Sequence, residues 1–215
     1  MKNAMAQASR WLKAAALCGL FLAVPAQAEG DPALLRDIQS RLADDTVIRG
    51  NFTQTRQLAG IKKRLSANGS FVVDKTRGVL WRAVKPLAQT TRITQGEILQ
   101  KDGGQVLMNL NAEQEPAVSA ISRVLFSLFD GNMAALAEYF DYRGQPNGGK
   151  DGGWQLHFTP RDAGMRAVIA SLTLEGDHVV RHVTLTSAAG DVSRIAFSDI
   201  ATDHALTTDE RAQFE

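Results

Sequence analysis

The feature that most constrains the fold of this chain is a series of short segments rich in β-branched and aromatic residues, separated by Gly, Asn and Asp. Such segments are typical of antiparallel strands joined by tight turns. A first block of predicted strands comprises Val47–Gln57, Arg64–Asp74, Gly78–Val84, Leu87–Gln95, Glu97–Lys101 and Gln105–Asn111. A second block comprises Gly153–Thr159, Val168–Glu175, Val179–Thr186 and Val192–Ile200. The pattern therefore predicts roughly ten strands.

Helices are predicted at the start of the chain and between the two blocks. Asp31-Pro32 supplies a cap and a proline at the first helical position, and helical spacing follows at Leu34, Leu35, Ile38 and Leu42, over about four turns. Between the blocks, a very apolar helix opens at Pro116 and ends at Asp130-Gly131, and a second short helix carries Met133, Leu136 and Phe140. Residues 201–215 are polar, and we expect them to be loosely ordered.

These elements predict a mainly β, α+β domain, in which a strongly bent antiparallel sheet is covered on one face by helices. Because successive side chains of a strand point to opposite faces, five residues are expected to point inward together: Phe71, Val73, Val79, Trp81 and Ile93. The space between sheet and helices is either a filled core or an apolar cavity, and the residue pattern allows both.

The first 28 residues have the form of a cleaved secretory signal peptide. A basic lead with Lys2, Arg10 and Lys13 precedes an apolar run from Ala14 to Val24, and Ala26-Gln27-Ala28 has the small-x-small form of a cleavage site. The apolar run is little more than half of the about twenty residues that a membrane span needs. We therefore expect cleavage after Ala28, a periplasmic location, and one domain over residues 29–215.

Composition restricts the function of the expected mature chain. Its only cysteine, Cys18, lies in the signal segment, so a disulfide, a Cys-bound metal or a cysteine nucleophile is excluded. Without residues 1–28, 21 Lys and Arg stand against 23 Asp and Glu, a balance that argues against a nucleic-acid partner.

Motifs that would support catalysis or metal binding are incomplete. The segment from Gly144 to Lys150 satisfies the spacing of a phosphate-binding loop, but Asp151 occupies the position of the hydroxyl that holds magnesium, so a hairpin loop is the better interpretation. His178 and His182 fall in a predicted strand, where about 13 Å separates residues four apart, too far to share an ion. No nucleophile motif is present. The sequence predicts a protein that is not an enzyme and has no metal or cofactor.

A small basic cluster lies at the predicted end of a hairpin. It comprises Lys62, Lys63 and Arg64, with Arg56 nearby. The cluster fits either a solvated hairpin end or a contact with an anionic lipid headgroup or a partner.

One stretch of about forty-five residues carries a specific series of motifs. They are Phe52-Thr-Gln-Thr-Arg56, Gly69-Ser-Phe71, Gly78-Val-Leu-Trp81, Lys85-Pro86-Leu87 and Thr91-Arg-Ile-Thr94. This series resembles the LolA family of periplasmic lipoprotein carriers, whose pattern is a phenylalanine followed by a hydroxyl-Gln step, a Gly-x-hydrophobic strand, a strand that ends in tryptophan, and a proline turn. After Ala117 the resemblance consists of the order of the elements.

The resemblance implies an incomplete β-barrel of about ten or eleven strands with a helical lid over an apolar cavity. It also implies a monomeric carrier that receives acylated lipoprotein or another lipid cargo from an inner-membrane transporter and passes it to an outer-membrane acceptor. Val79 and Trp81 match cavity positions of the family, and Lys75 stands where the family has an arginine that latches the lid, with Arg77 as its alternative. The expected cavity and lid residues are Leu35, Ile38, Phe52, Phe71, Val73, Val79, Trp81, Ile93, Ile121, Leu125, Phe129, Met133 and Leu136.

Two other functions compete with the carrier. The same half-barrel could serve as a lipid-sensing regulatory module of the envelope, or as an enzyme that acts on lipids. The absence of a nucleophile constellation in the sequence argues against the enzyme.

Overall fold

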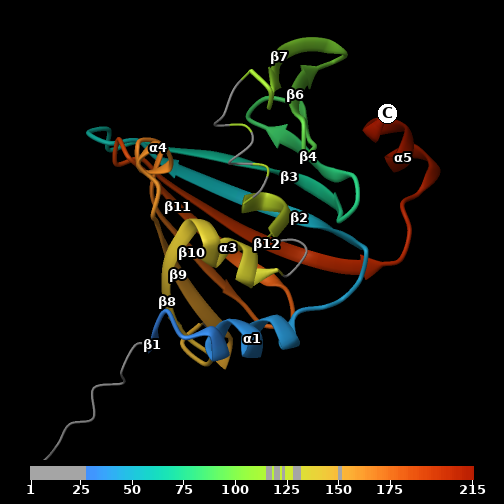
Figure 1. The fold of residues 1–215 in the computed structure, drawn as a ribbon. Coiled ribbons are helices and arrows are strands. Elements are labelled where there is room, and N and C mark those ends of the chain that lie inside the picture. Colours follow the sequence, from blue (N-terminus) through green and yellow to red (C-terminus); the bar gives the residue numbers. More distant parts are fainter. Residues whose placement is uncertain (1–27, 115–117, 119–121, 123, 128–131, 150–151) are drawn as a thin grey trace, which may run out of the picture.

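The chain forms one open, strongly bent antiparallel sheet with helices on both of its faces (Figure 1). The computed structural model describes residues 28–114, 118, 122, 124–127, 132–149 and 152–215. Within these ranges the strand order is β1-β8-β9-β10-β11-β12-β2-β3-β4-β5-β6-β7, and all neighbours are antiparallel. β12 joins the two blocks by pairing with β2, and the outer edges at β1 and β7 do not meet.

The first block of the sheet consists of β2 (Val47–Gln57), β3 (Arg64–Asp74), β4 (Gly78–Lys85), β5 (Gln89–Ile93), β6 (Glu97–Asp102) and β7 (Gln105–Asn111). The second consists of β8 (Phe140–Gln145), β9 (Trp154–Pro160), β10 (Ile169–Gly176), β11 (Val180–Ser187) and β12 (Val192–Asp203), with the two-residue β1 (Ala28–Glu29) beside β8. The helices are α1 (Pro32–Arg41), α3 (Met133–Tyr139), α4 (Ala163–Arg166) and α5 (Thr208–Phe214). Val118, Ser122 and residues 124–127 are also helical and are called the middle helix.

The predicted fold class is confirmed, and all ten predicted strands are present. The prediction for Phe140 was wrong, because α3 ends at Tyr139 and Phe140 begins the unpredicted strand β8. Gly144 and Gln145 end β8, and residues 146–149 follow in the connection to the antiparallel β9, as expected for a hairpin. Among the described helices, none is long and apolar enough to cross a bilayer.

The α1 helix and α3 cover the concave face of the second block, where the interior is filled. The Asp31 side chain accepts a hydrogen bond from Ala33 N at 2.8 Å, and Pro32 occupies the first turn, as predicted for this helix start. The helix has ten residues, about three turns rather than four. Its apolar side chains meet those of α3 and of β8 to β10 in one buried core, which contains Leu34, Leu35, Ile38, Met133, Leu136, Phe140, Trp154, Leu156, Phe158, Leu172 and Leu174.

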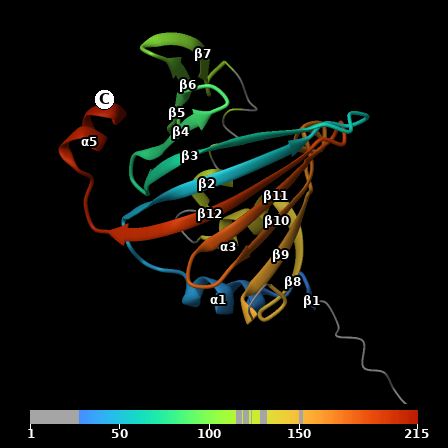
Figure 2. The same cartoon turned by 180° about the vertical axis from the view of Figure 1, so that it is seen from behind.

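The other face of the sheet carries α5, in a part of the chain that was wrongly expected to be loose. The sequence signal is a capping box, in which the Thr207 hydroxyl accepts from Glu210 N and the Glu210 carboxylate accepts from Thr207 N. Leu206 and Phe214 pack against Val47, Val72 and Leu80. Figure 2 shows α5 beside β4, away from α1 and α3.

A bidentate ion pair between Arg49 and Glu210 holds α5 against β2. Arg49 Nε and Nη2 donate to the two carboxylate oxygens of Glu210 at 2.7 and 2.8 Å, and Nη2 also donates to the Ala205 carbonyl. The Glu210 side chain is only 12% exposed. The hydrogen bond from Arg49, above all, lowers the pKa of Glu210 to about 2, although burial opposes this shift.

We predict that Glu210→Gln lowers the free energy of unfolding by about 2 kcal/mol at neutral pH, because it removes a charge-assisted pair. The native state depresses the pKa of Glu210, so this stabilisation is complete above about pH 5 and is lost as pH falls towards 2. Urea unfolding at several pH values measures it, with Asp209→Asn on the same helix as the control. A wild-type advantage that stays constant down to pH 3 would contradict the prediction.

Candidate functional site

Four aromatic rings gather on the concave face of the first block and the adjoining β12, and we call them the aromatic cluster: Phe52, Phe71, Trp81 and Phe197. The rings of Phe52 and Trp81 are stacked, with centroids 3.8 Å apart. Phe197 meets Phe71 edge-on at 4.9 Å and Trp81 at 6.1 Å. The cluster therefore joins β2, β3, β4 and β12 by ring contacts, each of which is worth about 0.5–1.5 kcal/mol beyond area burial.

Strand register explains why the rings meet. Phe71 pairs with Trp81 on β4 and with Gly50 on β2, while Phe52 pairs with Phe197 on β12 and with Gly69 on β3. Phe52 and Phe71 thus each have a glycine as a partner on the neighbouring strand. A Cβ added to Gly50 would lie 2.9 Å from the Phe71 ring, so the missing side chain provides the space that this ring occupies.

An aliphatic row borders the aromatic cluster. Ile48, Val73, Val79 and Ile93 are register partners across β2 to β5 and point to the same face. Ile200 of β12 joins them although it is an odd number of residues from Phe197. The register of β12 shifts between Ser198 and Ala201, and Asp199 has φ of 50°, so one extra residue restores Ile200 to the concave face.

The exposure of this surface differs from that of the core under α1 and α3. In the core, Trp154, Leu156, Phe158 and Leu174 are 0% exposed. On the concave face of β2 to β5 and the adjoining β12, Phe71, Val73 and Val79 are buried, but five large apolar side chains around them are only half-buried: Ile48, Trp81, Ile93, Phe197 and Ile200. This surface has a small buried centre with a wide, partly accessible apolar border, whereas the core under α1 and α3 has a large buried centre with a border that includes Val180, Val183 and Leu185.

The structure divides the predicted cavity and lid residues between these two regions. Phe52, Phe71, Val73, Val79, Trp81 and Ile93 lie on the concave face of the first block. Leu35, Ile38, Met133 and Leu136 lie in the filled core, at 3% exposure or less. Leu125 is half-buried on the middle helix, whereas Ile121 and Phe129 lie outside the described residues. A role in ligand binding stays a prediction for all of them.

Three residues of the site were missed from the sequence. Ile48, Phe197 and Ile200 contact the cluster Phe71, Val73 and Val79, and all three belong to strands that were predicted. Simple alternation along Val192–Ile200 could have nominated Phe197. Ile200 could not have been found in this way, because the bulge at Asp199 reverses the alternation.

The predicted latch residues lie at the turn from β3 to β4. Lys75 Nζ donates to the Ala43 carbonyl at 3.4 Å and is 3.9 Å from Asp44 Oδ1, so Lys75 contacts the segment that follows α1. Arg77 is exposed. The neighbouring Asp74 is 6% exposed and accepts hydrogen bonds from Thr76 and Arg77, which fixes the turn that carries both cations.

The histidines do not belong to the aromatic cluster, although His182 lines a small pocket together with Phe197. His178 lies in the turn before β11 rather than in the strand, 3.3 Å from Asp177, and His182 pairs with Glu175 and Ala196 in the sheet. Burial, and then the nearby Arg143 charge, lower the pKa of His157. Within the described ranges, no three His, Cys, Asp or Glu side chains are grouped to hold a metal ion.

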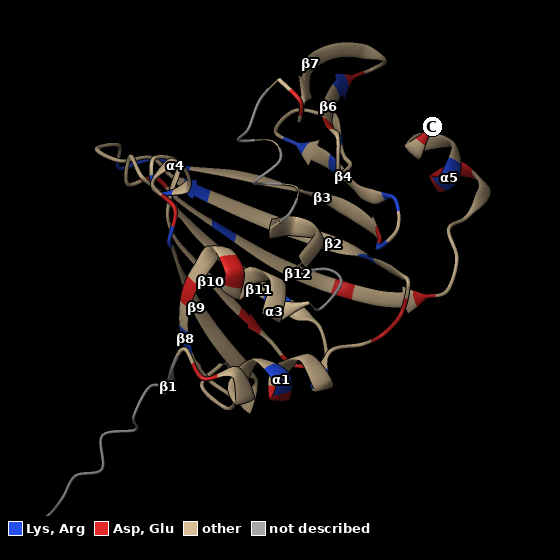
Figure 3. Cartoon of the chain, viewed as in Figure 1, with Lys and Arg blue, Asp and Glu red and all other residues tan. Residues whose placement is uncertain are grey.

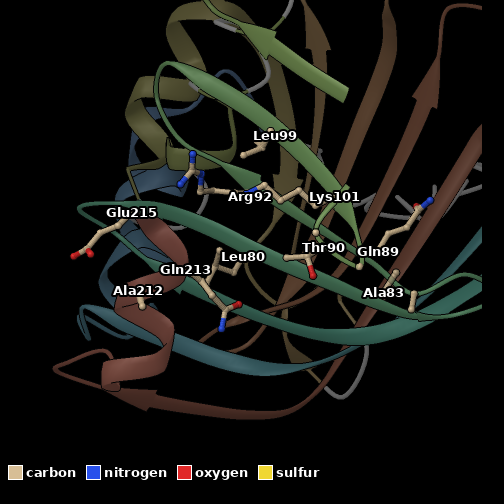
Figure 4. A pocket seen from close by; sticks show the side chains of 13 residues that line it. Leu80, Ala83, Gln89, Thr90, Arg92, Leu99, Lys101, Ala212, Gln213 and Glu215 are labelled. Carbon is tan, nitrogen blue, oxygen red and sulfur yellow. The ribbon is translucent and has the colours of Figure 1, made fainter. Parts of the chain in front are cut away.

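A separate cavity of about 520 Å³ lies on the opposite face, between β4 to β6 and α5 (Figure 4). Leu80 and Leu99 form part of its wall, with Arg92 and Lys101 beside them. The Arg92 guanidinium is engaged by the Phe214 carbonyl at 3.1 Å and by Glu97 at 2.8 Å. This cavity therefore depends on the position of α5 and shares no wall residue with the aromatic cluster.

A comparison with protein families relates this geometry to known proteins. The model of the family described as "Outer membrane lipoprotein carrier protein LolA-like" matches residues 28–214, which include every described helix and strand up to Phe214. The chain belongs to this LolA-like family. The family is one of carrier proteins by its description. A comparison with curated protein sequences gave no match.

Several solved structures are similar to this LolA-like chain. A LolA superfamily protein from Nitrosomonas europaea is 11% identical, with a TM-score of 0.42, over 83% of this chain and 97% of the other. A putative outer membrane lipoprotein-sorting protein domain from Vibrio parahaemolyticus is 8% identical, with a TM-score of 0.46, over 85% and 97%. Pseudomonas aeruginosa MucB, in complex with MucA, is 15% identical, with a TM-score of 0.43, over 85% of this chain and 59% of that chain.

We predict that Gly50→Ala destabilises the LolA-like fold by about 1–3 kcal/mol, because the new Cβ overpacks the aromatic cluster. It would lie 2.8 Å from the Ser198 carbonyl oxygen and 2.9 Å from the Phe71 ring. Urea unfolding gives the cost, and near-UV circular dichroism reports the displaced rings. Gly96→Ala is the matched control, since no atom lies within 4 Å of its added Cβ. Equal stability of the two variants would show that Gly50 is not needed for this packing.

Proposed function

We propose that this LolA-like protein is a periplasmic carrier that binds the acyl chains of lipoproteins or other lipidated molecules on the concave face of the first block. The observation that carries the proposal is the set of half-buried apolar side chains around Phe71, Val73 and Val79. These side chains are neighbours on one face, and a contiguous apolar surface that stays accessible is typical of a binding site, whereas apolar residues exposed singly are not. The remaining exposure of these side chains is the area that an acyl chain would cover.

The chemistry of this surface suits a hydrocarbon tail. The side chains that the described strands bring together there are aromatic or aliphatic, so binding depends on removing apolar area from water. Burial is worth about 0.8 kcal/mol per methylene, so full cover of a chain of about sixteen carbons is worth on the order of 12 kcal/mol. A carrier that holds this much needs a cover that moves when the cargo leaves.

The middle helix is the proposed cover. Its described turns lie on the same side of the sheet as α1 and α3, in front of β2 and β12 in Figure 1 and behind them in Figure 2. Val118, Val124 and Phe126 are buried and Leu125 is half-buried. Val124 packs in the core with α1 and α3, so the middle helix is attached to that core on one side. In this proposal Leu125, with Ile121 and Phe129 of the same sequence segment, closes over the acyl chain.

The proposed route follows from the family and from the signal-like segment. Residues 1–28 would direct export and be removed after Ala28. An inner-membrane transporter would load the carrier, and an outer-membrane acceptor would unload it. The filled core under α1 and α3 would keep the second block rigid while the cover over the first block opens, and a monomer would suffice for this cycle.

We predict that Trp81→Asp abolishes uptake of palmitic acid and of a synthetic triacylated lipopeptide, because it places a charge in the stacked pair with Phe52. Native mass spectrometry of the purified mature chain measures bound ligand directly. Val84→Asp on the same strand is the control, since Val84 is 59% exposed. This variant should bind both ligands normally.

A second variant separates loss of binding from loss of folding. Ile93→Asp alters the other end of the apolar surface, where Ile93 is half-buried and pairs with Val79. Wild-type uptake by folded Trp81→Asp and Ile93→Asp would refute the acyl site. The shuttle itself is tested by release of the bound lipopeptide to a second membrane in the presence of envelope extract. Stable binding without release would instead favour the lipid-sensing role.

A further inference from the structure

One end of the sheet brings together three segments that we call the basic tip: the end of the β2–β3 hairpin from Leu58 to Leu65, which includes the first two residues of β3, α4 with Val168, and the β11–β12 turn from Ala188 to Gly190. Ala59 N donates to Asp191 Oδ1 at 3.0 Å, and a Cβ on Gly190 would lie 3.5 Å from Ala59 Cβ. Ala188 N donates to the Val168 carbonyl at 3.0 Å. The hairpin, the turn and α4 therefore form one surface, at the same end of the sheet in both views (Figures 1 and 2).

The exposed charges of the basic tip without an ion-pair partner are positive. Lys62, Lys63, Arg64 and Arg166 are exposed, and none of them forms an ion pair with a described residue. Arg194 is exposed on β12 beside Thr55 of the hairpin. Figure 3 shows Lys and Arg on the strands that run to this end.

The acidic groups of this surface are already engaged. Asp191 accepts from Arg56 at 2.7 Å as well as from Ala59 N, and Asp162 caps α4 by accepting from Met165 N. The pKa of Asp191 is lowered, first by the Ala59 backbone hydrogen bond and then by Arg56. These carboxylates therefore hold the loop and α4 in place. The Arg166 guanidinium donates to the Pro160 and Arg161 carbonyls, which leave its positive charge unneutralised, and Lys62, Lys63 and Arg64 are available to an anionic partner.

Large apolar side chains stand among these cations. Ile61 and Leu65 are each 50% exposed and flank Lys62, Lys63 and Arg64 in the sequence. Val168, after α4, is 47% exposed. Val84 and Leu87 are exposed beside a single lysine, Lys85, whereas the basic tip combines its exposed aliphatic residues with three consecutive cations. This combination is typical of segments that place apolar tips between lipid headgroups while lysine and arginine meet the phosphates.

We propose that the basic tip is a docking site for the surface of a bilayer that contains anionic phospholipids. The described contacts hold Ile61 at the turn, where the Gln57 side chain binds its carbonyl. Ile61 and Leu65 insert among the headgroups, and the cations of the hairpin and α4 bind lipid phosphates. The tip is formed by the same strands, β2 and β3, that carry Phe52 and Phe71, so docking directs one end of the concave face towards the membrane. The proposal stands independently of acyl binding by the aromatic cluster.

Vesicle flotation of the mature chain tests the docking site. Vesicles of phosphatidylcholine are compared with vesicles that contain about 30% phosphatidylglycerol, at about 0.05 M and about 0.5 M salt. We expect binding to the anionic vesicles only, and weaker binding at high salt. Removing the three hairpin charges together, as Lys62→Gln, Lys63→Gln and Arg64→Gln, should weaken it at least about tenfold. The pair Ile61→Ser and Leu65→Ser should weaken it at both salt concentrations.

Matched controls lie elsewhere on the surface. The pair Val84→Ser and Leu87→Ser removes equally exposed aliphatic residues, and the pair Lys85→Gln and Lys101→Gln removes exposed charges. Both controls should bind like wild type. Equal binding to the two vesicle types, or equal losses in tip and control variants, would overturn the proposal.

Two further outcomes would assign the binding to a different ligand or a different surface. Vesicle binding that is lost in Trp81→Asp but retained in the tip variants would mean that acyl capture, and not docking, holds the protein to the membrane. Binding to soluble polyglutamate that matches the vesicle affinity and is unaffected by Ile61→Ser and Leu65→Ser would assign the tip to an acidic protein. Either result would refute a lipid docking site, and neither would refute acyl binding on the concave face.

Discussion

The structure depends on the antiparallel register that links β12, β2, β3 and β4. This register pairs Phe71 with Gly50 and Phe52 with Gly69, so two large rings each have a glycine as a neighbour. A shift of one residue in β3 would move Phe71 and Val73 to the face that α5 covers and bring Val72 to the concave face. Packing on both faces fixes this register. Val72 and Leu80 pack against Leu206 and Phe214 on one face, and the aromatic rings pack against one another on the other face.

Both blocks of the sheet have alternating apolar residues on their concave face, but the apolar side chains are buried to different extents. In the second block, α1 and α3 supply enough apolar side chains to bury Trp154, Leu156 and Phe158 completely. On β2 to β5 and β12 the strands also bring apolar side chains together, but Trp81, Ile93 and Phe197 remain half-buried. Filling one side makes that side a rigid frame, since close-packed interiors resist deformation. In the carrier that we propose, a movable cover is then needed on the other side only.

The strands and the inward residues of β3 and β4 could be predicted because both follow from local alternation between turn residues. Strand β8 could not, since Met133, Leu136 and Phe140 continue one helical spacing and no glycine or proline marks where α3 ends. The α5 helix was missed although Thr207 and Glu210 form a capping box in the sequence. Its place on the sheet depends on Arg49, 161 residues before Glu210, a contact that no local pattern contains.

The filled core separates two groups of residues that the sequence placed together in one predicted cavity. Leu35, Ile38, Met133 and Leu136 have the helical spacing of a lid, and spacing alone does not tell a lid from a core helix. Burial tells them apart: Ile38 and Met133 at 0% exposure have no apolar area left for a ligand, whereas Trp81 does. An acyl chain gains free energy only from area that it newly removes from water. The acyl site that we propose therefore lies over β2 to β5 and β12, where large apolar side chains are still half-buried.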